Sequence, residues 1–332
     1  MSSPPTRSLP RLAGARSVVL ALLIAAAVGA VNVVPVRSQV PRLDARSTRA
    51  AISPDAPWSP AWDRAPSQQV PLSAQNITPP FGGGTVQAVT VRALYDAQQL
   101  YLLLEWADDK PDDAVNGVIE FSDAAAVMFP AVAASVLPPF TMGAAGSPVN
   151  IWQWKAVWES DIAGGFATSR TRYPNTVVDF YPNADDPIYR PATYVGNPLA
   201  QQDHASPIEN LIAESFGTLT HADLQDVSGS GEWRDGHWRA LFVRPLKAAE
   251  ASEAGFDVGS TTNIAFAVWN GGAGDRDGVK SIAPWIELGI GTGATVSGFG
   301  GAQILIVAVI ALALGAAAVV VFIGQRQRRG AV

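Results

Sequence analysis

Two long apolar stretches, one near each end of the chain, limit which residues can form a globular fold. Residues 304–323 contain neither a charge nor a proline, and Arg326, Arg328 and Arg329 follow directly. About 20 apolar residues are long enough to cross a bilayer as one helix. We therefore predict a transmembrane helix at 304–323 and, because basic residues stay on the cytoplasmic side, a cytoplasmic tail at 324–332.

The other apolar stretch, 17–36, follows three arginines, which is the layout of a secretory signal. Residues 1–36 are thus either a cleaved signal peptide or a retained signal anchor, and small-residue triplets within them would permit cleavage. With the tail cytoplasmic, we expect the protein in the cell membrane and its main domain outside the cytoplasm, on the periplasmic or outer face. Residues 37–57 and the Gly-rich residues 291–303 are predicted to be linkers on either side of a domain at 58–290.

Composition excludes several kinds of chemistry for this domain. The 332 residues include no cysteine, which rules out disulfides, iron–sulfur clusters, thiolate zinc sites and covalently attached haem. The three histidines, His204, His221 and His237, show no metal-binding spacing. Residues 58–290 carry thirteen basic against twenty-seven acidic side chains, a formal charge of −14, so we expect no nucleic-acid partner.

Short apolar runs of strand length dominate the domain. We predict strands at 86–95, 100–106, 118–121, 124–129, 149–158, 238–244 and 264–269. Many short strands joined by long loops are typical of an all-β protein, here a largely antiparallel β-sandwich. One short inserted helix is predicted at 206–215, because Ser206 and Glu209 form a capping-box pattern and Pro207 suits the first turn. The long segment 170–205 is rich in Tyr, Pro, Asn and Asp and is predicted to be a loop.

Several segments together resemble a known family. They are the opening from Trp58 to Asp108, P-P-F-T-M-G at 138–143, N-I-W-Q-W-K-A at 150–156, G-E-W-R-D-G-H-W at 231–238, and A-V-W-N-G at 267–271 with D-G-V-K-S at 277–281. They are similar to the haem-binding γ subunit of ethylbenzene dehydrogenase. Related γ subunits belong to dimethyl sulfide dehydrogenase, to selenate and chlorate reductases, and to nitrite oxidoreductase-type complexes. The resemblance spans roughly residues 58–290.

The resemblance implies a β-sandwich that holds one non-covalent haem b between a methionine and a lysine. Carried over residue by residue, it places these two iron ligands at Met142 and Lys280. It also implies partners, a molybdenum-containing catalytic α subunit and an iron–sulfur β subunit, with single electrons passing between the latter and a quinone pool or cytochrome c. It implies no catalytic residue in this chain. Many members of that family are soluble, so the predicted C-terminal membrane helix is a difference from them.

The residues themselves leave alternatives for each ligand. Met128 lies in a strand-like apolar run, where core packing is the ordinary role of methionine, whereas Met142 lies on a loop. Among the lysines, Lys155 is the second candidate, on the strand face of Ile151 and Gln153. An amine binds iron only when it is deprotonated, so the ligand must be a buried lysine.

Neighbouring groups and rival functions also remain open. Asn150 and Trp152 are candidates to line the haem, and Arg172, Arg190 and Arg244 are candidates to bind its propionates. The ten tryptophans suit a porphyrin pocket, although most are expected to pack in the core. A carbohydrate-binding β-sandwich at the cell surface is the alternative function, and a cofactor-free structural membrane subunit is a third.

Overall fold

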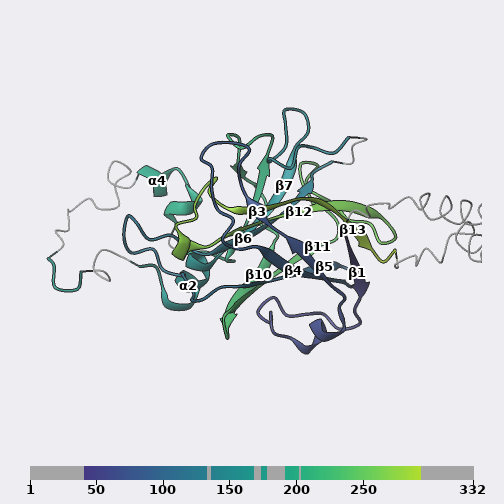
Figure 1. The fold of residues 1–332 in the computed structure, drawn as a ribbon, viewed down its shortest axis with the longest axis horizontal. Coiled ribbons are helices and arrows are strands. Elements are labelled where there is room, and N and C mark those ends of the chain that lie inside the picture. Colours follow the sequence, from purple (N-terminus) through teal and green to yellow (C-terminus); the bar gives the residue numbers. More distant parts are fainter. Residues whose placement is uncertain (1–40, 133–135, 168–172, 178–190, 202, 293–332) are drawn as a thin grey trace, which may run out of the picture. The chain divides into compact units, whose positions relative to one another are not determined.

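Short strands make up most of the regular secondary structure in the computed structural model, which describes residues 41–132, 136–167, 173–177, 191–201 and 203–292 (Figure 1). The strands are β1 (Arg42–Ser47), β2 (Ser67–Pro71), β3 (Ser73–Ala74), β4 (Ala88–Tyr95), β5 (Gln99–Ala107), β6 (Ala124–Pro130), β7 (Val149–Lys155), β8 (Ile208–Ala213), β9 (Thr220–His221), β10 (Ser228–Arg234), β11 (His237–Pro245), β12 (Thr261–Trp269) and β13 (Ser281–Ile290). The helical elements are η1 (Pro60–Arg64), α2 (Ala156–Gly164), α4 (Pro191–Tyr194), η2 (Pro198–Ala200) and η3 (Gly271–Ala273). The predicted mostly β class is confirmed for this part of the chain.

The strands form two half-sheets that β1 joins. One half runs β10-β11-β5-β4 and the other runs β13-β12-β6-β7-β8-β9. Arg42–Ala45 of β1 pair in parallel with β13, and Arg46 and Ser47 pair in parallel with β4. The pairings within each half are antiparallel, as expected. One strand therefore belongs to both layers and fixes them to each other.

Tryptophans fill the core between the two half-sheets. Trp154 of β7 lies between two tryptophans of the other half, with its ring centroid 4.8 Å from that of Trp238 and 5.9 Å from that of Trp106. Each of the three side chains is at most 4% exposed. Burying a large apolar side chain stabilises a fold by about 1.5–3 kcal/mol, so this cluster helps to hold the layers together. The expectation that tryptophans pack mainly in the core is confirmed for these three.

Four local predictions were wrong. The segment predicted as a helix at 206–215 contains β8, which pairs with β7 in antiparallel register. The strand predicted at 149–158 ends at Lys155, where α2 begins. Residues 118–121 form no strand, and β1 lies within the expected linker 37–57.

The predicted membrane segments lie outside the described residues. These are the signal or anchor at 1–36, the helix at 304–323 and the tail at 324–332, together with most of the tether at 291–303. In the part of the chain that the structure describes, no helix is long and apolar enough to cross a membrane. Most of the predicted loop at 170–205 also falls outside it.

Candidate cofactor site

A cavity of about 660 Å³ lies over the face of the second half-sheet that points away from the tryptophan core. Its floor is formed by strands β6, β7, β8 and β12, through Met128, Ile151, Leu211 and Ala265. These side chains belong to a second apolar cluster, separate from the core between the half-sheets. A sheet is normally apolar on both faces only when both are covered, so loops are expected to close this face.

Met142 contributes a thioether to the cavity wall from the loop before β7. Its backbone has φ +75°, a left-handed conformation that residues other than glycine adopt at a cost of order 1 kcal/mol or more. The turn is closed by a hydrogen bond from the Gly143 N–H to the Pro139 carbonyl, 2.9 Å long. Such strain persists only where the surrounding structure holds it, and it gathers at ligand-binding positions.

Lys280 lines the same cavity, at the end of the loop that joins β12 to β13. Its Nζ lies 4.7 Å from the centroid of the Trp269 ring, and no carboxylate in the described residues lies within ion-pair distance of it. Burial lowers the pKa of the Lys280 ammonium to about 8, and the charge of Asp277 partly opposes that change. This amine is therefore much easier to deprotonate than a surface lysine.

The loop that carries Lys280 is held by Gln75. Its side-chain Nε2 donates to the carbonyls of Thr78, Pro80 and Gly278, at 2.6, 3.1 and 3.1 Å. Its backbone N–H donates to the Lys280 carbonyl, and the Lys280 backbone also packs against Gly83, where a Cβ would lie only 2.2 Å from that carbonyl. Glycine is needed at 83 for this close approach, so the position of Lys280 is set by the backbone.

Lys155 also lines the cavity, but it is engaged in other contacts. Its ammonium forms an ion pair with the carboxylate of Glu209, and it lies 3.8 Å from the centroid of the Trp158 ring. The other oxygen of Glu209 lies 2.9 Å from Nδ1 of His221, which borders the cavity as well. Burial lowers the pKa of the Lys155 ammonium, and the Glu209 carboxylate opposes that change because it favours the charged form, which cannot bind a metal.

Asn150 and Trp152 lie on the opposite face of β7 and do not line the cavity. Both are fully buried, and the Trp152 indole donates to the Asn150 side chain at 3.0 Å. Of the arginines considered for propionates, Arg244 is buried and paired with Asp226 and Glu253. Arg172 and Arg190 lie outside the described residues. Side chains alternate between the two faces of β7. Asn150 and Trp152 therefore point into the core, and Ile151, Gln153 and Lys155 point to the cavity.

Sequence reasoning did not single out Glu209 and His221. The sequence predicts Glu209 in a helix cap, and the three histidines lack a metal-binding spacing. The register of β8 places Glu209 opposite Gln153 of β7, and β9 places His221 opposite Leu211. A period-two interpretation of Ile208–Ala213 would have placed Glu209 and Leu211 on one face.

The residues present suit a flat, largely apolar cofactor that carries a metal. The volume falls within the range of about 300–1,000 Å³ found for pockets that hold cofactor-sized ligands. The walls are mainly apolar and include two donors, the sulfur of Met142 and the amine of Lys280. A thioether and a deprotonated amine are both able to bind a haem iron axially.

Comparisons of this chain with known proteins agree on one family. The model of the family described as "Ethylbenzene dehydrogenase" matches residues 59–281. A Haloferax mediterranei protein named as a respiratory nitrate reductase heme subunit is 27% identical over 74% of this chain and 72% of its own length. The chlorate reductase subunit gamma of Ideonella dechloratans is 25% identical over 81% and 92%, and the dimethylsulfide dehydrogenase subunit gamma of Rhodovulum sulfidophilum is 27% identical over 70% and 74%.

Among solved structures, a family 9 carbohydrate binding module from Caldicellulosiruptor kristjanssonii in complex with glucose covers 76% of this chain and 87% of its own. The sequence identity is 10% and the TM-score is 0.36. A likeness of this degree carries no argument for carbohydrate binding.

Proposed function

Because this chain belongs to the ethylbenzene dehydrogenase family, we propose that it is the haem b electron-transfer subunit of a molybdenum oxidoreductase complex. Its relatives are named as a heme subunit and as gamma subunits of two oxidoreductases. In this role it relays single electrons between an iron–sulfur subunit and a quinone pool or a cytochrome c. The catalytic chemistry belongs to the molybdenum subunit.

The observation that supports the proposal most is that Met142 and Lys280 line one apolar cavity. They come from loops far apart in the sequence, and the sequence resemblance assigns a ligand role to the same two residues. The chain has few other candidates, since only three methionines and four lysines occur in it. We propose that Met142 and Lys280 are the two residues that would hold the haem iron.

Each part of the site has a physical task in this proposal. Bound haem supplies a one-electron couple at its iron. Burial of Lys280 keeps its amine easy to deprotonate, and the hydrogen bonds of Gln75 hold its loop in place. The apolar floor, with Met128, Ile151 and Leu211, excludes water from the cofactor. Water exclusion and ligand identity are the main means by which a protein sets a haem potential.

The location proposed is the membrane, with the β-domain outside the cytoplasm. Support comes from the sequence alone, from the uncharged residues 304–323 and the arginines that follow them. Protease added to spheroplasts of the producing cell should digest the domain and leave an epitope placed after Arg326 intact. Protection of the domain, with loss of the epitope, would reverse the orientation.

The haem assignment is tested by purifying the full chain after expression with sufficient haem. We expect a Soret band, one haem per chain by the pyridine haemochrome assay, and complete extraction of the haem by acidic acetone, since no cysteine can hold it covalently. The double variant Met142→Ala/Lys280→Ala is the matched control and should be purified with little haem. A colourless but folded wild-type chain would contradict the proposal and favour the carbohydrate-binding alternative.

A further inference from the structure

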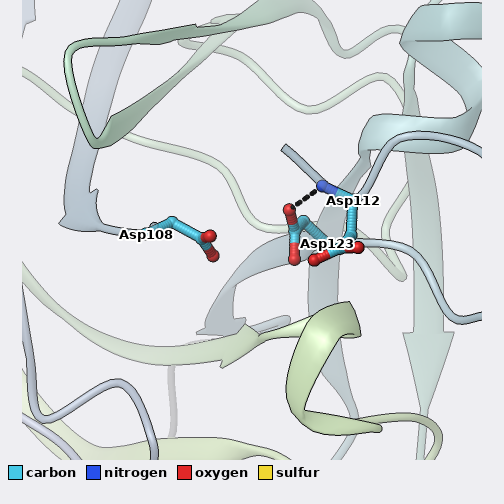
Figure 2. Close-up of side chains that lie close together, drawn as sticks. All are labelled: Asp108, Asp112 and Asp123. Atoms are coloured by element: carbon cyan, nitrogen blue, oxygen red, sulfur yellow. Dashed lines mark hydrogen bonds between the residues drawn. The ribbon is translucent and has the colours of Figure 1, made fainter. Parts of the chain in front are cut away.

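Three aspartates lie close together on the side of the domain where β5 ends and β6 begins (Figure 2). Asp108 follows β5 directly, Asp123 precedes β6 directly, and Asp112 lies on the loop between them. One carboxylate oxygen from each lies within 4.8 Å of the others. Because β5 and β6 belong to different half-sheets, the cluster lies where the chain crosses from one layer to the other.

Two of these carboxylates have a buried oxygen with no hydrogen-bond partner in the described part of the chain, Oδ2 of Asp108 and Oδ2 of Asp112. Asp108 is only 5% exposed, and Figure 2 shows its carboxylate directed toward the other two aspartates. A buried carboxylate oxygen without a partner is costly, because it has lost its hydration without replacement. Two such oxygens in one cluster indicate a ligand that both would contact.

The other oxygens of the cluster accept hydrogen bonds that hold the carboxylates in place. Asp123 is 0% exposed and accepts hydrogen bonds from the Trp238 indole, the Asp112 N–H and the Gly271 N–H, at 3.0, 2.7 and 2.8 Å. The other oxygen of Asp108 accepts from the Lys110 N–H at 3.1 Å. A Cβ on Gly272 would lie only 2.6 Å from Oδ2 of Asp112. The absence of a side chain at Gly272 therefore leaves room for the Asp112 carboxylate.

The negative charge of the cluster is poorly compensated by the protein. Lys110 is the one cation paired with any of the three carboxylates in the described residues, through Oδ1 of Asp112 at 2.6 Å, and its side chain is 68% exposed. The buried carboxylates of Asp108 and Asp123 have no ion-pair partner there. Like charges held together in a buried place are stabilised by a bound cation.

We propose that Asp108, Asp112 and Asp123 bind a calcium ion that ties the β5–β6 crossing to the start of the loop after β12. Calcium prefers six to eight oxygen ligands at about 2.3–2.6 Å in flexible geometry and readily takes several carboxylates. Magnesium requires about 2.0–2.1 Å and keeps most of its water. The Gly271 N–H contact links the site to η3, and the same loop ends at Lys280.

Isothermal titration of the EDTA-treated full chain with Ca²⁺ tests the proposal directly, and thermal unfolding followed by circular dichroism tests it independently. We expect one Ca²⁺ per chain. At a free concentration about 100-fold above Kd, the melting temperature should rise by about 5–10 °C, since a ligand that binds only the folded state stabilises it by mass action. The same concentration of Mg²⁺ should give a much smaller rise.

Asp108→Asn is the informative variant, and Asp109→Asn is its matched control, because Asp109 is the exposed neighbour and loses the same charge. Asp108→Asn should lose the Ca²⁺-dependent rise, while in EDTA it should melt no lower than the wild type, since removing one charge relieves repulsion. Asp109→Asn should keep the rise. Three outcomes would each overturn the proposal, whether or not Asp108→Asn folds. They are the absence of a heat of Ca²⁺ binding to the wild type, an equal rise in melting temperature with Mg²⁺, and an equal loss of the Ca²⁺-dependent rise in Asp109→Asn.

Discussion

The ammonium of Lys155 contacts the carboxylate of Glu209 at the wall of the same cavity that Lys280 lines. The two lysines share a site but differ in their surroundings. Lys155 has a carboxylate partner that stabilises its charge, whereas Lys280 faces the Trp269 ring and has no such partner in the described residues. Burial lowers the pKa of both lysines, but the charged form of Lys155 is supported by a carboxylate in direct contact, and that of Lys280 is not.

Replacement of Lys280 by alanine should convert low-spin haem to a high-spin or water-ligated form, because it removes the proposed amine ligand. Lys155→Ala should leave the low-spin spectrum essentially unchanged. Absorption and electron paramagnetic resonance spectra of the two purified variants, recorded at the same haem content, make the comparison.

Lys155→Ala is also expected to destabilise the fold, because within the described segments it leaves the Glu209 carboxylate with His221 as its one side-chain partner. His221→Ala is a needed control, since a histidine whose Nδ1 lies against a carboxylate is a common metal-binding arrangement. Its low-spin spectrum should persist, as should that of the triple variant lacking His204, His221 and His237. A low-spin spectrum that disappears with Lys155 or His221 and survives loss of Lys280 would show the lysine assignment to be wrong.

Replacement of Met142 by alanine should lower the reduction potential of the haem and open one axial position. A soft thioether favours ferrous iron, so its loss stabilises the ferric state. Potentiometric titration gives the potential, and carbon monoxide binding to the reduced protein reports the open position. Met128→Leu is the matched control, because Met128 also lines the cavity and leucine preserves its volume. An equal shift in both variants would mean that the effect comes from packing.

The sequence predicted strands at β4, β5, β6, β7, β11 and β12, but it predicted none at β1, β2, β10 or β13. At β8 it failed because two structures fit one pattern. In Ile208–Ala213, the apolar residues Ile208, Leu211 and Ile212 follow helical spacing and a capping box precedes them, yet the segment is β8. Nearly every position of β8 is buried, so no polar alternation marks it as a strand. The pairing with β7 overrides the local signal, together with the buried hydrogen bond, 2.6 Å long, that Nδ2 of Asn150 donates to Oδ1 of Asn210.

A related failure concerns α2, which begins at Ala156. Its N-cap, Lys155, makes no side-chain capping hydrogen bond, so the sequence carries no start signal there.

For the cofactor site, the alternation along β7 was predicted correctly, and it was enough to separate Lys155 from Trp152. The aspartate cluster was missed because Asp108, Asp112 and Asp123 look like ordinary polar loop residues, and only the fold shows that Asp108 and Asp123 are buried.

Replacement of Arg244 by methionine should destabilise the domain by about 3–5 kcal/mol, the usual cost of removing one partner of a buried ion pair. Arg244 is 0% exposed and its side chain pairs with Glu253 at 2.5 Å and with Asp226 at 2.9 Å. Arg234→Met is the control, because its pair with Glu232 is half exposed and should contribute less than about 1 kcal/mol. Urea unfolding curves measure both values, and similar losses would argue against a structural role for the Arg244 network.

In the haem-free chain, Lys280 should make stability depend on pH in the alkaline range. Its folded pKa of about 8 lies below its ordinary value of 10.5, so between these pH values the unfolded state binds more protons than the folded state. Stability therefore rises with pH across this window, and the dependence due to Lys280 vanishes below about 8. The difference between the wild type and Lys280→Met in urea midpoints, measured from pH 7 to 11, isolates this contribution.

In the haem-bound chain, acidification should convert the low-spin haem to a high-spin form. The proton and the iron compete for the same lone pair of Lys280, so iron binding moves the transition below the haem-free pKa of about 8. Met142 has no proton to gain in that range.

The other titratable groups at the cavity are Lys155, Glu209, His221 and Asp277, and among them His221→Ala should leave the midpoint of the spin-state transition unchanged. Lys280→Ala should show no transition at all, because it is already high-spin at neutral pH. A wild-type transition that moves with His221→Ala while Lys280→Ala stays low-spin would assign the titrating ligand to the histidine.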